Sequence, residues 1–123
     1  MTVRNLEVSA VDRDATTSIY TLAGDLYGLK EGYAFQEQVR TRIARGARKI
    51  VLDLAAIERI DSSGIGILVS VMFSASHAGG GMVLAAISAR VEKVLGIAML
   101  LDRIERAASV DEALEKLDGM TIR

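Results

Sequence analysis

Residues 59–66 read Arg-Ile-Asp-Ser-Ser-Gly-Ile-Gly and stand out as a polar stretch in a largely apolar part of the sequence. They follow Lys49–Leu54, a short β-branched run that predicts a buried strand parallel to an earlier one. They lead into Ile65–His77, which reads as a helix that is apolar nearly all round. The stretch therefore lies after a strand and opens a helix, where open α/β sheets usually meet ligands or partners.

Outside this stretch, the spacing of hydrophobic residues alternates between two residues, which is typical of strands, and about 3.6, which is typical of helices. The other predicted elements are the hairpin strands Asn5–Val11 and Thr17–Ala23, a glycine-bounded loop at 24–28, helix Glu31–Arg45, strand Met82–Ile87, a helix from Ser88 to about Met99, a short edge strand Arg103–Ala108, and a last helix begun by a capping box at 109–112. The order ββαβαβα(β)α predicts one α/β domain over residues 5–118, with a small mixed sheet packed with about four helices. Residues 1–4 and 119–123 are predicted to be short tails.

Composition excludes several function classes. The 123 residues include no Cys and one His, which excludes disulfides, thiolate metal sites and multi-histidine metal sites. That His77 lies far along the predicted helix from the serines, and no G-x-S-x-G elbow is present, which disfavours a serine hydrolase. We therefore expect no enzyme activity, no cofactor and no metal.

Charge and hydropathy bear on location and partners. The net charge of −1 argues against a nucleic-acid binder, and the basic cluster at 40–49 is interpreted as a solvated helix end. The first twelve residues carry charges and no long apolar run, so no signal peptide is expected. The longest apolar stretch, Gly64–Phe73, falls short of the ~20 residues that span a bilayer. We expect a cytoplasmic protein with no direct membrane insertion.

Two interpretations of the helix start remain open. Asp and Ser are preferred residue types at a helix N-cap, so Asp61, Ser62 or Ser63 is expected to cap this helix. Alternatively, a phosphate on a serine there would be stabilised by free backbone N–H groups and the helix dipole. Gly64 and Gly66 are expected to leave room for a second protein to approach. The helix that follows is either buried on both sides or partly exposed to a partner.

Residues 60–68, Ile-Asp-Ser-Ser-Gly-Ile-Gly-Ile-Leu, resemble the signature of STAS domains, specifically of bacterial anti-sigma factor antagonists. Residues 50–60 resemble the family's strand and its approach to this signature, and residues 24–26, Gly-Asp-Leu, resemble its glycine–acidic–apolar turn. The order of elements agrees over about residues 5–118. The resemblance implies a single STAS-like α/β domain.

The resemblance also implies a function. Such antagonists bind an anti-sigma factor that is also a serine protein kinase, and they are not enzymes themselves. The kinase phosphorylates the serine directly after the aspartate, here Ser62, which releases the antagonist, and a phosphoserine phosphatase restores it. The residues implied in partner binding are Asp25, Leu26, Asp61, Ser62, Ser63, Gly64 and Ile65.

One segment departs from the family pattern. Residues 25–32 read Asp-Leu-Tyr-Gly-Leu-Lys-Glu-Gly, where many relatives show a simpler run into the first helix, so the details of partner recognition are expected to differ. The alternative function is a STAS scaffold or accessory subunit, in a signalling assembly or a membrane transporter complex, without a phospho-switch. The intact Asp-Ser-Ser-Gly favours the switched antagonist. The sequence leaves a homodimer open.

Overall fold

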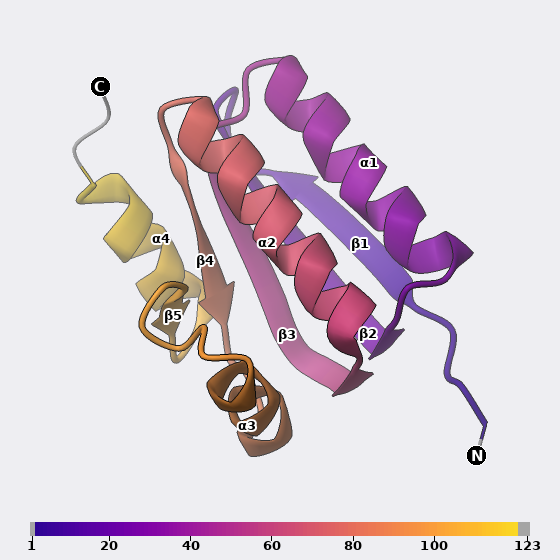
Figure 1. Cartoon of the computed structure of the whole chain (residues 1–123). Helices are drawn as coiled ribbons and strands as arrows, with labels where there is room; N and C mark the ends of the chain where they lie inside the picture. Colours follow the sequence, from indigo (N-terminus) through magenta and orange to yellow (C-terminus); the bar gives the residue numbers. More distant parts are fainter. Residues whose placement is uncertain (1, 121–123) are drawn as a thin grey trace.

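The computed structural model describes residues 2–120, which fold into a five-stranded sheet packed with four helices (Figure 1). The elements are β1 (Glu7–Asp12), β2 (Thr17–Leu26), α1 (Lys30–Ala44), β3 (Lys49–Ile60), α2 (Ser62–His77), β4 (Gly81–Ala85), α3 (Ala89–Ile97), β5 (Glu105–Ala107) and α4 (Val110–Asp118). The strands lie in the order β1-β2-β3-β4-β5, with β1 antiparallel to β2 and all other neighbours parallel. The predicted order of elements and mixed sheet are confirmed.

Helices cover both faces of the sheet. Figure 1 shows α1 and α2 side by side across one face, where their side chains share a core with α3. α4 packs on the other face, against Val51 and Val83. In β3, Ile50 and Leu52 point into the first core while Val51 points into the second. A strand buried on both faces must be apolar at consecutive positions, and this explains the continuous apolar run.

The neighbouring strands β2 and β3 are longer than predicted. β2 continues through the predicted loop to Leu26, and β3 continues past Leu54 to Ile60. Both strands stay hydrogen-bonded to each other over this extension, with Asp25 opposite Arg59 and Leu26 opposite Ile60. Backbone pairing between strands thus extends beyond the apolar run from which the strands were predicted.

The helix ends follow local chemistry. α2 begins at Ser62 rather than Ile65 because the Asp61 side chain caps it. The predicted cap of α4 is confirmed, since the Ser109 hydroxyl accepts the N–H of Glu112 at 3.1 Å. Within residues 2–120 no helix has both the length and the hydropathy that crossing a membrane requires. The predictions for residues 1 and 121–123 lie outside the described residues.

Candidate functional site

The candidate site lies where β2 and β3 end side by side and α2 begins. Asp61, the first residue after β3, is the N-cap of α2: its Oδ1 accepts the N–H of Gly64 at 2.7 Å. Its Oδ2 accepts the N–H of Gly28 at 3.4 Å, and its own N–H donates to the carbonyl of Leu26 at 3.4 Å. The N-cap interpretation is therefore confirmed for Asp61, which also joins the helix start to the loop after β2.

Both serines are exposed in the first turn of α2. Ser63 lies over Gly28, where a Cβ would come within 2.4 Å of the Ser63 Cβ and 3.1 Å of the Tyr33 hydroxyl oxygen. The Ser62 hydroxyl makes no hydrogen bond with any residue of the described range 2–120. Because Asp61 supplies the cap, neither hydroxyl is needed to start the helix.

The two signature glycines differ in their surroundings. Gly64 is buried, and a Cβ on it would lie 2.0 Å from the carbonyl oxygen of Leu26. The expectation that Gly64 leaves room for a second protein is thus wrong, because β2 already occupies that space. Gly66 is exposed, and a Cβ there would meet nothing among the described residues. Only Gly66 offers an open backbone of the kind expected for close approach.

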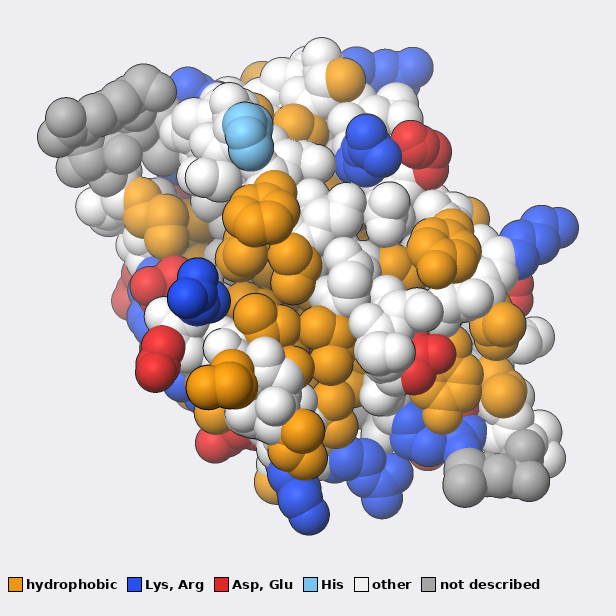
Figure 2. Space-filling model, in the orientation of Figure 1, with side chains coloured by type: hydrophobic (Ala, Val, Ile, Leu, Met, Phe, Trp, Pro, Cys, Tyr) orange, Lys and Arg blue, Asp and Glu red, His pale blue; other side chains and the backbone are white. Residues whose placement is uncertain are grey.

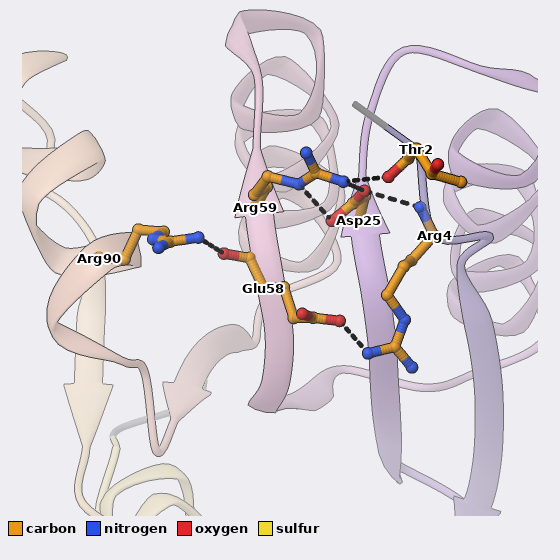
Figure 3. Close-up of polar contacts among 6 residues, drawn as sticks. All are labelled: Thr2, Arg4, Asp25, Glu58, Arg59 and Arg90. Carbon is orange, nitrogen blue, oxygen red and sulfur yellow. Dashed lines mark hydrogen bonds and ion pairs between the residues drawn. The ribbon is translucent and has the colours of Figure 1, made fainter.

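Asp25 and Leu26, predicted to contact a partner, are 3% and 0% exposed. The Asp25 carboxylate is used within the chain: Oδ1 accepts Nε of Arg59 at 3.1 Å, and Oδ2 accepts Nη2 of Arg59 at 2.5 Å (Figure 3). These bonds hold the pKa of the Asp25 carboxyl below its ordinary value. In the isolated chain both side chains lie beneath the surface, so their direct contact with a partner stays a prediction.

The sequence reasoning missed the role of Arg59. It belongs to the polar stretch that prompted the site, but an ion pair across 34 residues leaves no local pattern. Its side chain is only 20% exposed, and its guanidinium carbon lies 5.9 Å from the centre of the Tyr27 ring. One general signal was available, since a buried acidic residue usually has a basic partner.

A stripe of accessible residues runs along α2 from the serine. Ser62, Gly66, Val69 and Phe73 follow the spacing i, i+4, i+7, i+11 and so share one helix face. We call these four residues the α2 stripe. Phe73 is 55% exposed, whereas Ile67, Leu68 and Val71 on the opposite face are buried. The helix is thus buried on one face rather than on both, and contact of its exposed face with a partner stays a prediction.

The apolar surface extends beyond α2. Figure 2 shows hydrophobic side chains gathered over α2 and toward α3. A groove lies between α2 and the segment after α3, and its lining residues are Val69, Met72, Phe73, Ala98, Met99, Leu100, Asp102 and Arg103. Met99, one of these lining residues, is 83% exposed.

No group of His, Cys, Asp and Glu among residues 2–120 is arranged to hold a metal ion.

Comparisons with known sequences agree with this arrangement. A model of the STAS domain matches residues 7–113. A putative anti-sigma factor antagonist of Thermotoga neapolitana is 41% identical over 76 residues, which are 61% of this chain and 66% of the relative. Its counterpart in Thermotoga maritima is 36% identical over 74 residues, 59% of this chain and 65% of the relative. The matched region thus spans just under two thirds of the length of these relatives.

Solved structures share the fold. The anti-sigma factor antagonist SpoIIAA in its unphosphorylated form has a TM-score of 0.79 at 21% identity, over 94% of this chain and 99% of that one. The putative antagonist of Thermotoga maritima has a TM-score of 0.78 at 25% identity, over 90% of this chain and 94% of that one. The murine anion transporter Slc26a9 has a TM-score of 0.71 at 16% identity, over 95% of this chain and 22% of that one. With the family model spanning most of the chain and the same fold in these structures, the chain belongs to the STAS domain family.

Proposed function

We propose that the chain is an anti-sigma factor antagonist that binds an anti-sigma factor with serine kinase activity, and that phosphorylation of Ser62 switches this binding off. The observation that carries the proposal is the exposed Ser62 hydroxyl directly after the capping Asp61. The curated relatives are named putative anti-sigma factor antagonists. SpoIIAA, which shares the fold, is described in an unphosphorylated and a phosphorylated form.

Local packing favours Ser62 over Ser63 as the acceptor. Ser63 is exposed but faces Gly28, where an added Cβ would come within 2.7 Å of its Oγ, so the loop after β2 lies along one side of it. Ser62 precedes it on the open end of the α2 stripe. In the proposed reaction the Ser62 Oγ attacks the γ-phosphorus of ATP, its proton passes to a base of the kinase, and ADP leaves. This chain supplies the substrate serine, while the partner supplies the catalytic groups.

The α2 stripe supports a partner that covers both the serine and apolar surface. Ser62 and Phe73 are the two ends of the stripe, about 16 Å apart along the helix axis at a rise of about 1.5 Å per residue. An exposed phenylalanine beside half-buried Val69 and Met72 is the composition that the centre of a protein interface favours. We propose that the anti-sigma factor covers the stripe, so Ser62 becomes part of the contact.

Charge explains the switch without refolding. A phosphate on Ser62 adds a charge of about −1.5 to −2 at neutral pH. It would lie beside the Asp61 carboxylate, which already has two backbone donors. Burying that charge in an interface is costly unless the partner pairs it. Phosphorylation therefore weakens the complex, and a phosphoserine phosphatase restores binding.

A STAS scaffold or transporter subunit without a phospho-switch is the alternative. The likeness to Slc26a9 and to a sulfate transporter family protein of Wolinella succinogenes stands at 16% identity and concerns the fold alone. The exposed serine in the first turn of α2 favours the switched antagonist.

The test uses the full chain, Mg-ATP and a purified serine kinase of the anti-sigma factor class from the same genome. Mass spectrometry locates the phosphate on the wild type, on Ser62→Ala and on the matched control Ser63→Ala. We expect one phosphate on Ser62 in the wild type and in Ser63→Ala, none in Ser62→Ala, and none without the kinase. Phosphate on another residue, or full labelling of Ser62→Ala, overturns the assignment, and stable binding with no labelling favours the scaffold.

A further inference from the structure

A buried ion pair links the ends of β2 and β3 to the start of the chain (Figure 3). Arg59 donates two hydrogen bonds to Asp25, whose side chain is fully buried. The same two residues hold the N-terminal segment: Asp25 Oδ2 accepts the N–H of Arg4 at 2.9 Å, and Arg59 Nη2 donates to the carbonyl of Thr2 at 2.7 Å. Residues 2–4, assigned to a tail by the sequence, are thus tied to the domain.

The pair lies where the register between the strands is irregular. Gly24 is opposite Ile57 but Asp25 is opposite Arg59, so β3 holds one extra residue, Glu58, at this point. A bulge of this kind interrupts the ladder and turns the strand. Beyond it only two residue pairs remain, Asp25 with Arg59 and Leu26 with Ile60. A bidentate ion pair is therefore well placed to set the register of the last residues of both strands.

Those last residues lead directly into the candidate site. Three residues after Asp25, the Gly28 N–H donates to Asp61, and two residues after Arg59 comes Asp61 itself. The Leu26 carbonyl between them accepts from Asp61 and lies against Gly64. A shift of one strand end relative to the other would thus separate Asp61 from Gly28 and move Ser63 relative to the loop.

The N-terminal segment, residues 2–5, contacts the same end of β2. The Asp25 N–H donates to the Arg4 carbonyl at 3.0 Å. Gly24 has φ +102°, and a Cβ on it would lie 2.4 Å from the carbonyl oxygen of Asn5. The segment thus lies in contact with the last residues of β2. Glu58 and Arg4 add an exposed ion pair outside the buried one, where solvent leaves it little strength.

We propose that the Asp25–Arg59 pair, with the N-terminal segment that it clamps, is the positioning element of the signature: it holds Asp61, Gly28 and the first turn of α2 in the arrangement that presents Ser62. Its effect on phosphorylation rests on the proposed function, whereas its effect on the geometry of the site does not. A buried ion pair adds little net stability compared with an apolar pair of similar size. A substitution of the pair by apolar residues can therefore change the geometry of the site while leaving the global stability of the domain nearly unchanged.

The experiment compares the wild type with the double variant Asp25→Leu/Arg59→Met, the milder variant Arg59→Lys, and the control Arg4→Gln, which removes only the exposed ion pair. Hydrogen exchange by NMR reports the amides of Gly28 and Gly64, which bond to Asp61, and those of Val83 and Leu84 in the sheet centre. We expect exchange at Gly28 and Gly64 to quicken at least about tenfold in the double variant, and less in Arg59→Lys. The exchange rates at Val83 and Leu84 stay unchanged in both variants, and all four rates in Arg4→Gln equal those of the wild type.

Unchanged exchange at Gly28 and Gly64 in both variants overturns the proposal, and so does equal quickening at Val83 and Leu84, which indicates a merely structural pair. If the double variant does not fold, Arg59→Lys decides on the same criterion. With the kinase, the positioning role predicts a raised KM for the chain as substrate and an unchanged kcat. A chain that no kinase labels contradicts the proposed function alone, because the exchange measurement needs no kinase.

Discussion

The backbone N–H of Gly28 points at Oδ2 of Asp61 at 3.4 Å, across 33 residues of sequence. The other oxygen of the same carboxylate accepts the N–H of Gly64 at 2.7 Å. One side chain thus starts α2 and fixes the loop after β2 beside it. The candidate site depends on this shared carboxylate, since the exposed serines follow it directly.

The first prediction concerns Asp61. We expect Asp61→Ala to lower the free energy of unfolding by about 1 kcal/mol, because the N-cap is lost, and Asp61→Asn to lower it less. Urea denaturation measures this. Ser109→Ala removes the cap of α4 and is the matched control, with a similar loss of stability but no effect on kinase binding. Kinase binding that falls equally in both variants would contradict a local role for Asp61.

A second prediction separates the two signature glycines. Gly64→Ala places a Cβ 2.0 Å from the Leu26 carbonyl oxygen, and the forced movement costs about 1–3 kcal/mol. Gly66→Ala meets no described atom and replaces a helical glycine, so the free energy of unfolding rises by about 0.5–1 kcal/mol. Thermal denaturation compares them. We expect Gly66→Ala nevertheless to weaken kinase binding, and equal stability of the two variants would show that the packing at Gly64 is misjudged.

The third prediction is a pH dependence. Hydrogen bonds from Arg59 hold the pKa of folded Asp25 below the ordinary value of 3.8, to which it returns on unfolding. A depressed folded pKa stabilises the fold above the unfolded pKa, and this contribution is lost as the pH falls through 3.8 toward the folded pKa. The stability advantage of the wild type over Asp25→Asn therefore shrinks as the pH falls from neutral through 3.8. Urea titrations that show a constant difference would contradict an ionised Asp25.

A fourth prediction concerns the apolar end of the α2 stripe. Phe73→Ser removes a 55% exposed ring, so the free energy of unfolding changes little while kinase affinity falls at least about tenfold. Val11→Thr is the matched control, since Val11 is 63% exposed on the edge strand β1. Calorimetric titration of the kinase with each variant measures the two affinities. Equal affinities for Phe73→Ser and Val11→Thr would remove Phe73 from the proposed interface.

Much of the fold is predictable from the sequence because its signals are local. Apolar periodicity predicts the helices and the cores of the strands, and Ser109 predicts its cap. The ends of β2 and β3 are not predictable in this way. Gly24 and charged Arg59 look like loop residues, yet they are held in strands by hydrogen bonds to distant parts of the chain.

The candidate site was predictable in position and less so in detail. The stretch around Ser62 is found because a polar run between a strand and a helix is a local feature. Gly64 and Asp25 were expected at a partner surface, and the structure buries both, one against Leu26 and one against Arg59. Their burial depends on which strand ends meet, and periodicity carries no information on that.

The proposed function depends on one property of Ser62, that a phosphate on it controls binding. The decisive measurement is calorimetric titration of the anti-sigma factor kinase with two preparations of the chain, one unphosphorylated and one phosphorylated at Ser62 alone, without ATP. We predict tight binding of the first and an affinity at least about a hundredfold lower for the second, because an unpaired charge is buried. Equal affinities of the two preparations would show that a phosphate on Ser62 does not control binding.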